Sequence, residues 1–141
     1  VSLPKFGLTQ EGIKFFAWSI GSEKDLDFDK LTKDIDVVYH CAGNVNVILP
    51  YDALKQPNVI GTRNIIEFCT RGTIKLLHYV STLSVFTSTN TTKRVINETD
   101  WIREDIPTEI LGGYAASKWV SECLVESAVQ QGLEVTFMDK P

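Results

Sequence analysis

The sequence lacks paired cysteines, long apolar runs and a signal peptide, and each absence excludes a class of protein. Cys41, Cys69 and Cys123 lie far apart in apolar stretches without a CxxC pair, so we expect reduced, buried thiols rather than disulfides. No apolar run approaches the ~20 residues of a membrane helix. The first residues also lack the basic-then-apolar order of a secretory signal. We therefore expect a cytoplasmic protein.

Positive charge and histidine are also scarce. The 14 Lys and Arg against 18 Asp and Glu leave a net charge of -4, and no basic stripe is present to neutralise phosphates. We expect no nucleic-acid partner. His40 and His78 lie within or beside strand-like runs without companions at ligand spacing, so no metal site is expected. The 141 residues suffice for one domain.

Three short apolar runs predict buried strands, at 35–41, 75–81 and 133–138. Each is rich in β-branched or aromatic residues and is bounded by polar residues or glycine. This pattern is expected when helices cover both faces of a parallel sheet.

Helical patterns separate these strands. The segment 51–70 predicts a helix that ends near Gly72, and Pro57 predicts a kink or two short helices within it. The segment 114–131 predicts a second helix, which Gly132 ends. Its apolar stripe at helical spacing is formed by Ala116, Trp119, Val120, Cys123, Leu124 and Ala128.

The order of strands and helices implies right-handed crossovers and a doubly wound α/β sheet. Upstream, 9–19 is a further helix candidate with Thr9 as its N-cap. The segment 86–113 is polar and without periodicity, and loops of this length are usually functional.

A dinucleotide-binding fold needs a Gly-rich turn after its first strand, and that turn is missing. Gly7 and Gly12 flank 8–11, but no strand precedes them and the third glycine is absent. The chain is therefore predicted to be the central part of a Rossmann-type parallel sheet, lacking the first strands and the Gly-rich turn.

Tyr114 and Lys118 are the most informative pair. Four residues apart on a helix, they lie on one face about one turn, or ~6 Å, apart. A lysine ammonium at that spacing favours the tyrosinate and lowers the pKa of a phenol from its reference value of ~10. Such a tyrosine is an acid suited to hydride transfer. The same spacing arises by chance in many helices, so the neighbouring sequence decides between a catalytic pair and a chance pair.

Those surroundings resemble the extended short-chain dehydrogenase/reductases. The matching segments are 36–43 (DVVYHCAG), 58–62 (NVIGT), 79–85 (YVSTLSV) and 113–119 (GYAASKW). More narrowly, the chain resembles the thioester reductase branch, through 4–8 (PKFGL), 44–46 (NVN) with 50–51 (PY), and the GGY and SKW context of the predicted active-site helix. That branch includes terminal reductase domains of non-ribosomal peptide synthetases, carboxylic acid reductases, aminoadipate reductases and fatty acyl-CoA reductases.

The resemblance implies a Thr-Tyr-Lys catalytic set of Thr82, Tyr114 and Lys118. Thr82 would hold the substrate carbonyl oxygen, to which Tyr114 donates, and Lys118 would lower the tyrosine pKa and hold the ribose of the cofactor. For Thr82 the alternative is a strand-end hydroxyl that caps a neighbouring backbone group. The implied cofactor is NADPH, with NADH possible.

Further positions support the cofactor or the site. Ala42 and Gly43 suit a backbone that passes close to the adenosine half of the cofactor, or else a tight turn. Ser81 is a neighbour candidate for the cofactor, with a structural hydroxyl as the alternative. Asn58 resembles the family's asparagine that bonds backbone across neighbouring strands, and we treat it as structural support.

The implied substrate is an acyl thioester on a phosphopantetheine carrier domain or CoA, reduced to an aldehyde or alcohol. Residues 1–141 would then be a partial NAD(P)-binding reductase domain, truncated at both ends. The family's Arg-Pro after the last strand is replaced by 139–141 (DKP), in which Lys keeps the charge but lacks a guanidinium group. The sequence does not predict which acyl group is bound. The alternatives are a sugar-nucleotide epimerase or hydroxysteroid dehydrogenase-like enzyme, or an inactive fragment without cofactor binding.

Overall fold

The computed structural model contains a three-stranded parallel sheet in the order β1-β2-β3. It describes residues 32–86, 95, 97, 102 and 112–138. The strands are β1 (Val37–His40), β2 (Leu76–Val80) and β3 (Val135–Met138). Both neighbouring pairs are parallel. The three predicted strands are therefore confirmed. β1 and β2 are shorter at both ends than the apolar runs that predicted them, and β3 begins later than its run.

The first crossover is helical from Tyr51 to Thr70, in three parts. These are α2 (Tyr51–Leu54), the π-helical η2 (Lys55–Ile60) and α3 (Gly61–Thr70). Pro57 lies inside η2, whose wider i to i+5 turn accommodates a residue without a backbone N–H. The prediction of a kink or two short helices is confirmed in part, since the π-helical stretch with Pro57 separates α2 from α3 while the chain stays helical throughout.

The second crossover is α4 (Gly113–Gln130), and glycine ends it as predicted. Gly132 has φ of 98° and its N–H donates to Val129 O at 2.9 Å, while Leu133 N–H donates to Ala128 O at 3.0 Å. These two bonds form a Schellman motif, which satisfies the last helical carbonyls. The chain then enters β3 directly.

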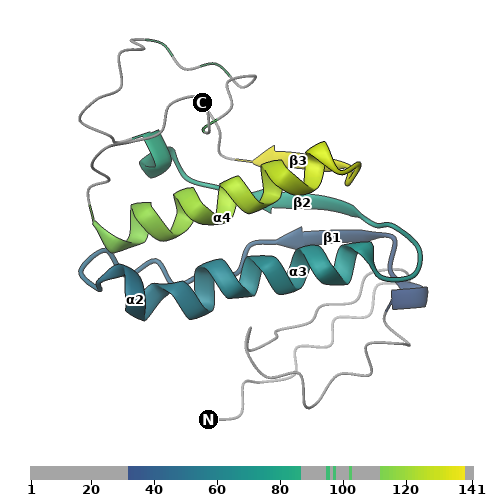
Figure 1. Ribbon diagram of the computed structural model, residues 1–141, viewed down its shortest axis with the longest axis horizontal. Coiled ribbons are helices and arrows are strands. Elements are labelled where there is room, and N and C mark those ends of the chain that lie inside the picture. The colour runs from purple at the N-terminus through teal and green to yellow at the C-terminus, as the bar shows by residue number, and fades with distance from the viewer. Residues whose placement is uncertain (1–31, 87–94, 96, 98–101, 103–111, 139–141) are drawn as a thin grey trace, which may run out of the picture.

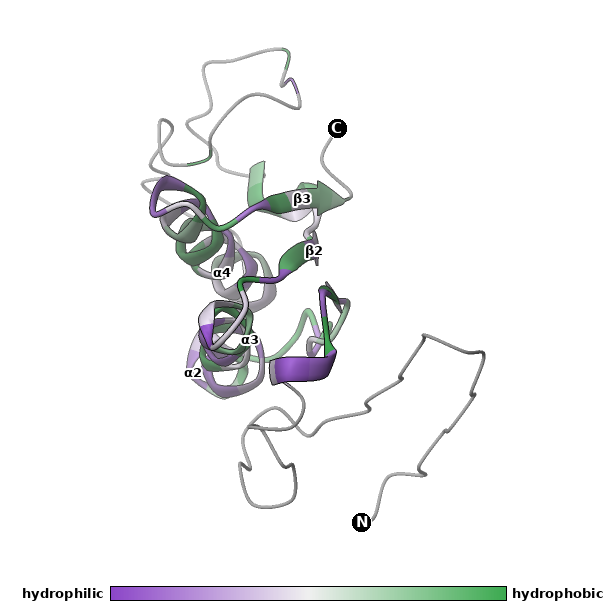
Figure 2. Cartoon of the chain, turned by 90° about the vertical axis from the view of Figure 1, so that its right-hand side faces the viewer, coloured by the Kyte–Doolittle hydropathy of each residue, from purple (hydrophilic) through white to green (hydrophobic). Residues whose placement is uncertain are grey.

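Helices α3 and α4 lie side by side on one face of the sheet (Figures 1 and 2). The core between the layers is formed by Cys69, Leu77, Tyr79, Val125, Ala128 and Leu133. On the other face, Val37, Tyr39 and Met138 are 40 to 64% exposed, so in the described part of the chain only one face is covered. The predicted parallel α/β sheet is confirmed, and helical cover of its second face stays a prediction.

The most buried face of α4 is polar, which corrects the predicted apolar stripe. Within that stripe only Ala128 is buried, and its other members are half-buried. The buried face includes Ser117, Lys118, Ser121, Glu122, Val125 and Glu126. Buried polar side chains require hydrogen-bond partners, and α4 finds them on η2 and at the end of β2. Hydropathy alone therefore selected the wrong face.

The cysteine prediction holds for Cys69, which is buried, but Cys41 is exposed and Cys123 half-buried. Cys41 follows β1, where the strand leaves the core for the sheet edge. Predictions for 9–19, for Gly7 and Gly12 and for 139–141 lie outside the described residues, as does most of 86–113. Among the described residues, no helix is long and apolar enough to cross a membrane.

Candidate functional site

The predicted site residues gather at the carboxyl edge of the parallel sheet, where open α/β sheets bind their ligands. Ala42 and Gly43 come just after β1, and Ser81 and Thr82 directly follow β2. Helix α4 begins at this edge, so its first turns bring Tyr114 and Lys118 to it (Figure 1). Each strand ends at this edge and each crossover helix begins near it, which explains why segments far apart in sequence meet here.

Lys118 is anchored to the end of β2. Its buried Nζ donates to Val80 O at 2.9 Å and lies 4.5 Å from the centroid of the Tyr79 ring. Burial lowers the pKa of Lys118 to about 8, and the charges of Glu122 and Cys41 oppose that shift. Lys118 thus remains largely protonated at neutral pH, with its cation held beside Ser81 and Thr82.

Tyr114 is the second residue of α4 and is half-buried, one turn before Lys118 on the same helix. Ser117 Oγ donates to Tyr114 O at 2.8 Å, which fixes the first turn. Among the described residues, the Tyr114 hydroxyl has no hydrogen bond to Thr82 or Lys118. The structure therefore places the predicted pair on one face without joining the two side chains directly.

Thr82 makes the capping contacts that we considered as the alternative to catalysis. Its Oγ1 accepts from Ser84 N at 3.3 Å and donates to Ser84 Oγ at 3.2 Å, at the start of η3 (Leu83–Phe86). Both distances are at the long end for hydrogen bonds. Thr82 is half-buried at the sheet edge, and its catalytic role stays a prediction.

Asn58 joins three elements around the site. Its Oδ1 accepts from Asn44 N at 2.7 Å, and its Nδ2 donates to Asn44 O at 3.0 Å and to Ser117 Oγ at 2.8 Å. Its backbone oxygen accepts from Ser121 Oγ at 3.0 Å and from Thr62 Oγ1 at 2.7 Å. The side chain of Asn58 thus ties the segment after β1 to η2 and α4.

Ala42 and Gly43 are both exposed, so their backbone is open at the sheet edge. A Cβ added to Gly43 would lie 3.4 Å from Asn58 Oδ1, an ordinary contact, and Gly43 does not have positive φ. Neither Asn58 nor a strained turn therefore requires glycine at this position. Close approach of a cofactor to Gly43 stays a prediction.

Three polar residues of α4 that contact the site escaped the sequence predictions. Ser117 and Ser121 bond Asn58, and the fully buried Glu122 accepts a hydrogen bond from Ser81 Oγ. Their spacing could have indicated them, because Glu122 follows Lys118 by four residues and Ser121 follows Ser117 by four, which places each pair on one face of the helix. Their burial became visible only once the packing face of α4 was known.

His40 is a structural residue beside the site. Its Nε2 lies 3.0 Å from Thr62 Oγ1, and burial, followed by the nearby Lys118 charge, lowers the pKa of His40 to about 4. The imidazole is therefore neutral at physiological pH. In the described part of the chain, no group of His, Cys, Asp or Glu side chains has the arrangement of a metal site.

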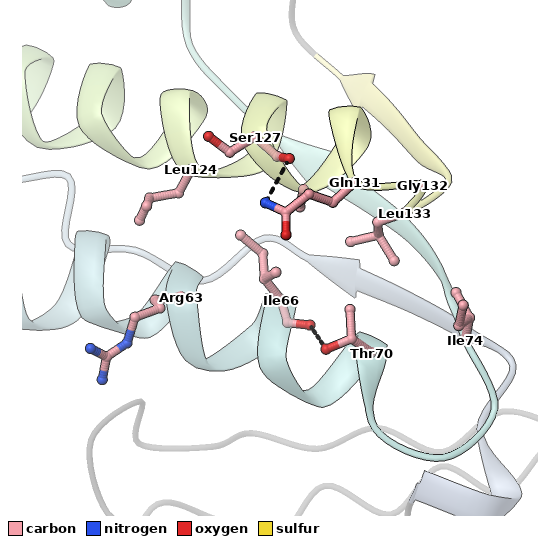
Figure 3. Close-up of a pocket in the computed structure, with 10 residues that line it drawn as sticks. Arg63, Ile66, Thr70, Ile74, Leu124, Ser127, Gln131, Gly132 and Leu133 are labelled. Atoms are coloured by element: carbon pink, nitrogen blue, oxygen red, sulfur yellow. Dashed lines mark hydrogen bonds between the residues drawn. The ribbon is translucent and has the colours of Figure 1, made fainter.

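A separate groove of about 310 Å³ lies between α3 and α4, towards their carboxyl-terminal ends. Figure 3 shows Arg63, Ile66, Leu124 and Gln131 on its walls, with Leu133 at the start of the chain leading to β3. None of the predicted site residues lines it. The groove is thus distinct from the carboxyl edge of the sheet.

With the geometry established, comparison with known proteins shows which of them share it. A family model of NAD-binding domains, described as male sterility protein, matches residues 23–138. A solved structure, the terminal R domain from the myxalamid PKS-NRPS biosynthetic pathway, superposes with a TM-score of 0.73 at 43% identity. That match covers 84% of this chain and 29% of the R domain.

Curated relatives agree with this match. The chain is 39% identical over 109 residues to a linear gramicidin synthase protein of Brevibacillus parabrevis, covering 75% of this chain and 2% of that protein. It is 39% identical over 108 residues to the glycine betaine reductase ATRR of Emericella nidulans, covering 77% of this chain and 8% of that protein. The chain therefore spans only a small part of the relatives that it matches.

Proposed function

Because this chain belongs to the male sterility protein family of NAD-binding domains, we propose that it carries the proton-donating part of an NAD(P)H-dependent thioester reductase. The observation that carries the proposal is the anchoring of Lys118, one turn from Tyr114, to the backbone oxygen of Val80, which precedes Thr82 by two residues. This arrangement sets a cation, a phenol and a hydroxyl along the carboxyl edge of one strand.

Lys118 would hold the nicotinamide end of a dinucleotide, and the backbone of Ala42 and Gly43 would lie close to its adenosine half. Lys118 offers an ammonium at the sheet edge, where a ribose hydroxyl is an acceptor for its free N–H groups. The exposed Ala42 and Gly43 leave the backbone after β1 uncovered, and Ser81 directly follows β2. Ala42, Gly43, Ser81, Tyr114 and Lys118 would hold the cofactor. NADPH is the preferred form by family resemblance, and NADH is the second choice.

In the proposed reaction, Tyr114 and Thr82 bind the carbonyl oxygen of the thioester. Two donors on one oxygen stabilise the negative charge that develops there during reduction. Bound NADPH supplies the hydride for the carbonyl carbon. Tyr114 gives its proton to the oxygen, and the Lys118 ammonium stabilises the tyrosinate that remains.

The first product is a hemithioacetal. Its carbon–sulfur bond breaks as the carbonyl re-forms, so the leaving sulfur takes up a proton and an aldehyde is released. A second molecule of NAD(P)H, bound by the same residues, would reduce the aldehyde to an alcohol. The substrate is proposed to be an acyl group on a phosphopantetheine carrier domain or on CoA, in keeping with the synthase and reductase names of the relatives.

The test uses the full-length protein that carries this chain, purified and assayed for NADPH oxidation with an acyl-CoA and an acyl-loaded carrier domain. We expect oxidation that depends on the thioester, together with an aldehyde or alcohol product. Epimerisation of a sugar nucleotide, or NAD(P)H oxidation only with a ketosteroid, would replace the proposal with its nearest alternatives. A protein that binds neither NADP(H) nor NAD(H) by fluorescence titration would exclude all three activities.

A further inference from the structure

Helix α4 carries a second ionisable residue one turn beyond Lys118. Glu122 is fully buried, and its Oε2 accepts a hydrogen bond from Ser81 Oγ. Ser81 is itself fixed, since its backbone N–H donates to Met138 O at 2.9 Å. The Glu122 carboxyl is therefore attached to the end of β2 at the point where β2 and β3 are joined.

A buried carboxyl group is costly to hold unless a nearby group compensates it. Lys118 is the cation closest in sequence on the same helix, and residues four apart on a helix are surface neighbours. Both side chains belong to the buried face of α4. Tyr114, Lys118 and Glu122 thus follow one another at intervals of one turn along that face.

The surroundings of Lys118 make Glu122 its main source of negative charge. Burial lowers the pKa of Lys118 to about 8, and Glu122 is the first of the two charges that oppose this shift, ahead of Cys41. From the sheet, the Tyr79 ring and the neutral His40 face the ammonium. These two sheet residues add no competing charge at neutral pH.

We propose that Glu122 is a positioning residue of the reductase site, which supplies the counter-charge for the Lys118 ammonium while it holds Ser81 at the end of β2. This inference rests on the proposed function, because it assigns Lys118 the task of supporting Tyr114 and the ribose. Glu122 acts through Lys118 and Ser81 and touches neither substrate nor cofactor. It adds a fourth polar residue to the Thr-Tyr-Lys set.

The test compares pH profiles of kcat/KM for the full-length protein and its Glu122→Gln variant. Removing the anion lowers the pKa of Lys118, so the ammonium is lost at lower pH. The high-pH limb of the profile should move down by about one pH unit, the lower end of the effect of a neighbouring opposite charge. Glu122→Asp keeps the charge and should return the limb towards the wild-type position.

Glu126→Gln is the matched control. Glu126 is equally buried on α4, one turn further on, and its Oε1 accepts from Ile102 N at 2.9 Å. It is not among the charges that shift Lys118. This variant should lose comparable stability and leave the high-pH limb in place. A limb that moves equally in both variants, or in neither, would overturn the inference.

A second readout does not depend on turnover. Lysine labelled with ¹³C at Cε allows Lys118 to be titrated by NMR, with the resonance assigned by a Lys118→Arg variant. We expect a lower Lys118 titration midpoint in Glu122→Gln than in the wild type or in Glu126→Gln. Unchanged midpoints would contradict the role of Glu122 even in an active enzyme. A shifted midpoint in a protein without thioester reduction would support the charge pairing and refute the function.

Discussion

Gly113, the first residue of α4, offers the most quantitative test of how the site is positioned. A Cβ added there would lie 2.4 Å from Leu49 O and 2.5 Å from both Pro50 C and Tyr51 N. Ordinary Cβ contacts begin at 3.4 Å, so Gly113→Ala requires a displacement of about 1.0 Å (3.4 − 2.4). All three obstructing atoms are backbone, which cannot rotate away. The start of α4 must therefore move, and Tyr114 with it.

The sign of the stability change tests this reasoning. Without a clash, alanine in a helix is favoured over glycine by about 0.5–1 kcal/mol. Overpacking costs typically about 1–3 kcal/mol, and rigid backbone on the other side places this contact near the upper end. We therefore expect a net loss of about 2 kcal/mol in the free energy of unfolding, measured by urea denaturation.

The effect on turnover should exceed the effect on stability. Displacement of a reacting group by 1 Å can reduce the rate by about 10²-fold, and Tyr114 is the next residue in the chain. The control is Gly132→Ala, where φ of 98° imposes strain but no atom lies within 4 Å of the added Cβ. It should lose about 1–3 kcal/mol of stability and keep its turnover. A Gly113→Ala protein as stable and as active as the wild type would refute the packing argument.

Two further changes test the support of the site. Asn58→Leu should lower the free energy of unfolding by about 1–3 kcal/mol, because Asn44 and Ser117 lose their hydrogen bonds to Asn58. The control Asn46→Ala, in the exposed segment, should lower it less. Equal losses in the two variants would contradict the role of Asn58. The depressed pKa of His40, about 4 against 6.5 for the unfolded chain, means that the unfolded state binds more protons between these values. Stability should be fully present above pH 6.5 and fall by about 3 kcal/mol towards pH 4, and His40→Gln should flatten this slope in pH-dependent urea denaturation.

Patterns that depend on local chemistry predicted the fold well. Apolar β-branched runs located all three strands, and Gly132 marked the end of α4 because only a residue tolerant of positive φ suits its Schellman motif. The Tyr114 and Lys118 spacing placed both residues on one helix. These features are decided within a few residues of the chain, so the sequence is sufficient for them.

Features that depend on tertiary partners were missed. In the π-helical turn around Pro57, Asn58 O accepts hydrogen bonds from Thr62 and from Ser121. A local sequence pattern does not predict a partner such as Ser121 on another helix. The polar face of α4 is buried because η2 and β2 satisfy it. Glu122 is the extreme case, a carboxyl group that hydropathy assigns to the surface and that the structure buries completely.

The most direct test of the central claim is turnover of an acyl thioester by Tyr114→Phe in the full-length protein. This substitution removes one hydroxyl and keeps the aromatic ring, so folding and cofactor affinity should change little. Loss of a positioned proton donor is expected to lower kcat by about 10²–10⁴-fold, with NADPH affinity measured separately by fluorescence. Unchanged turnover at saturating thioester and NADPH would show that Tyr114 is not the proton donor.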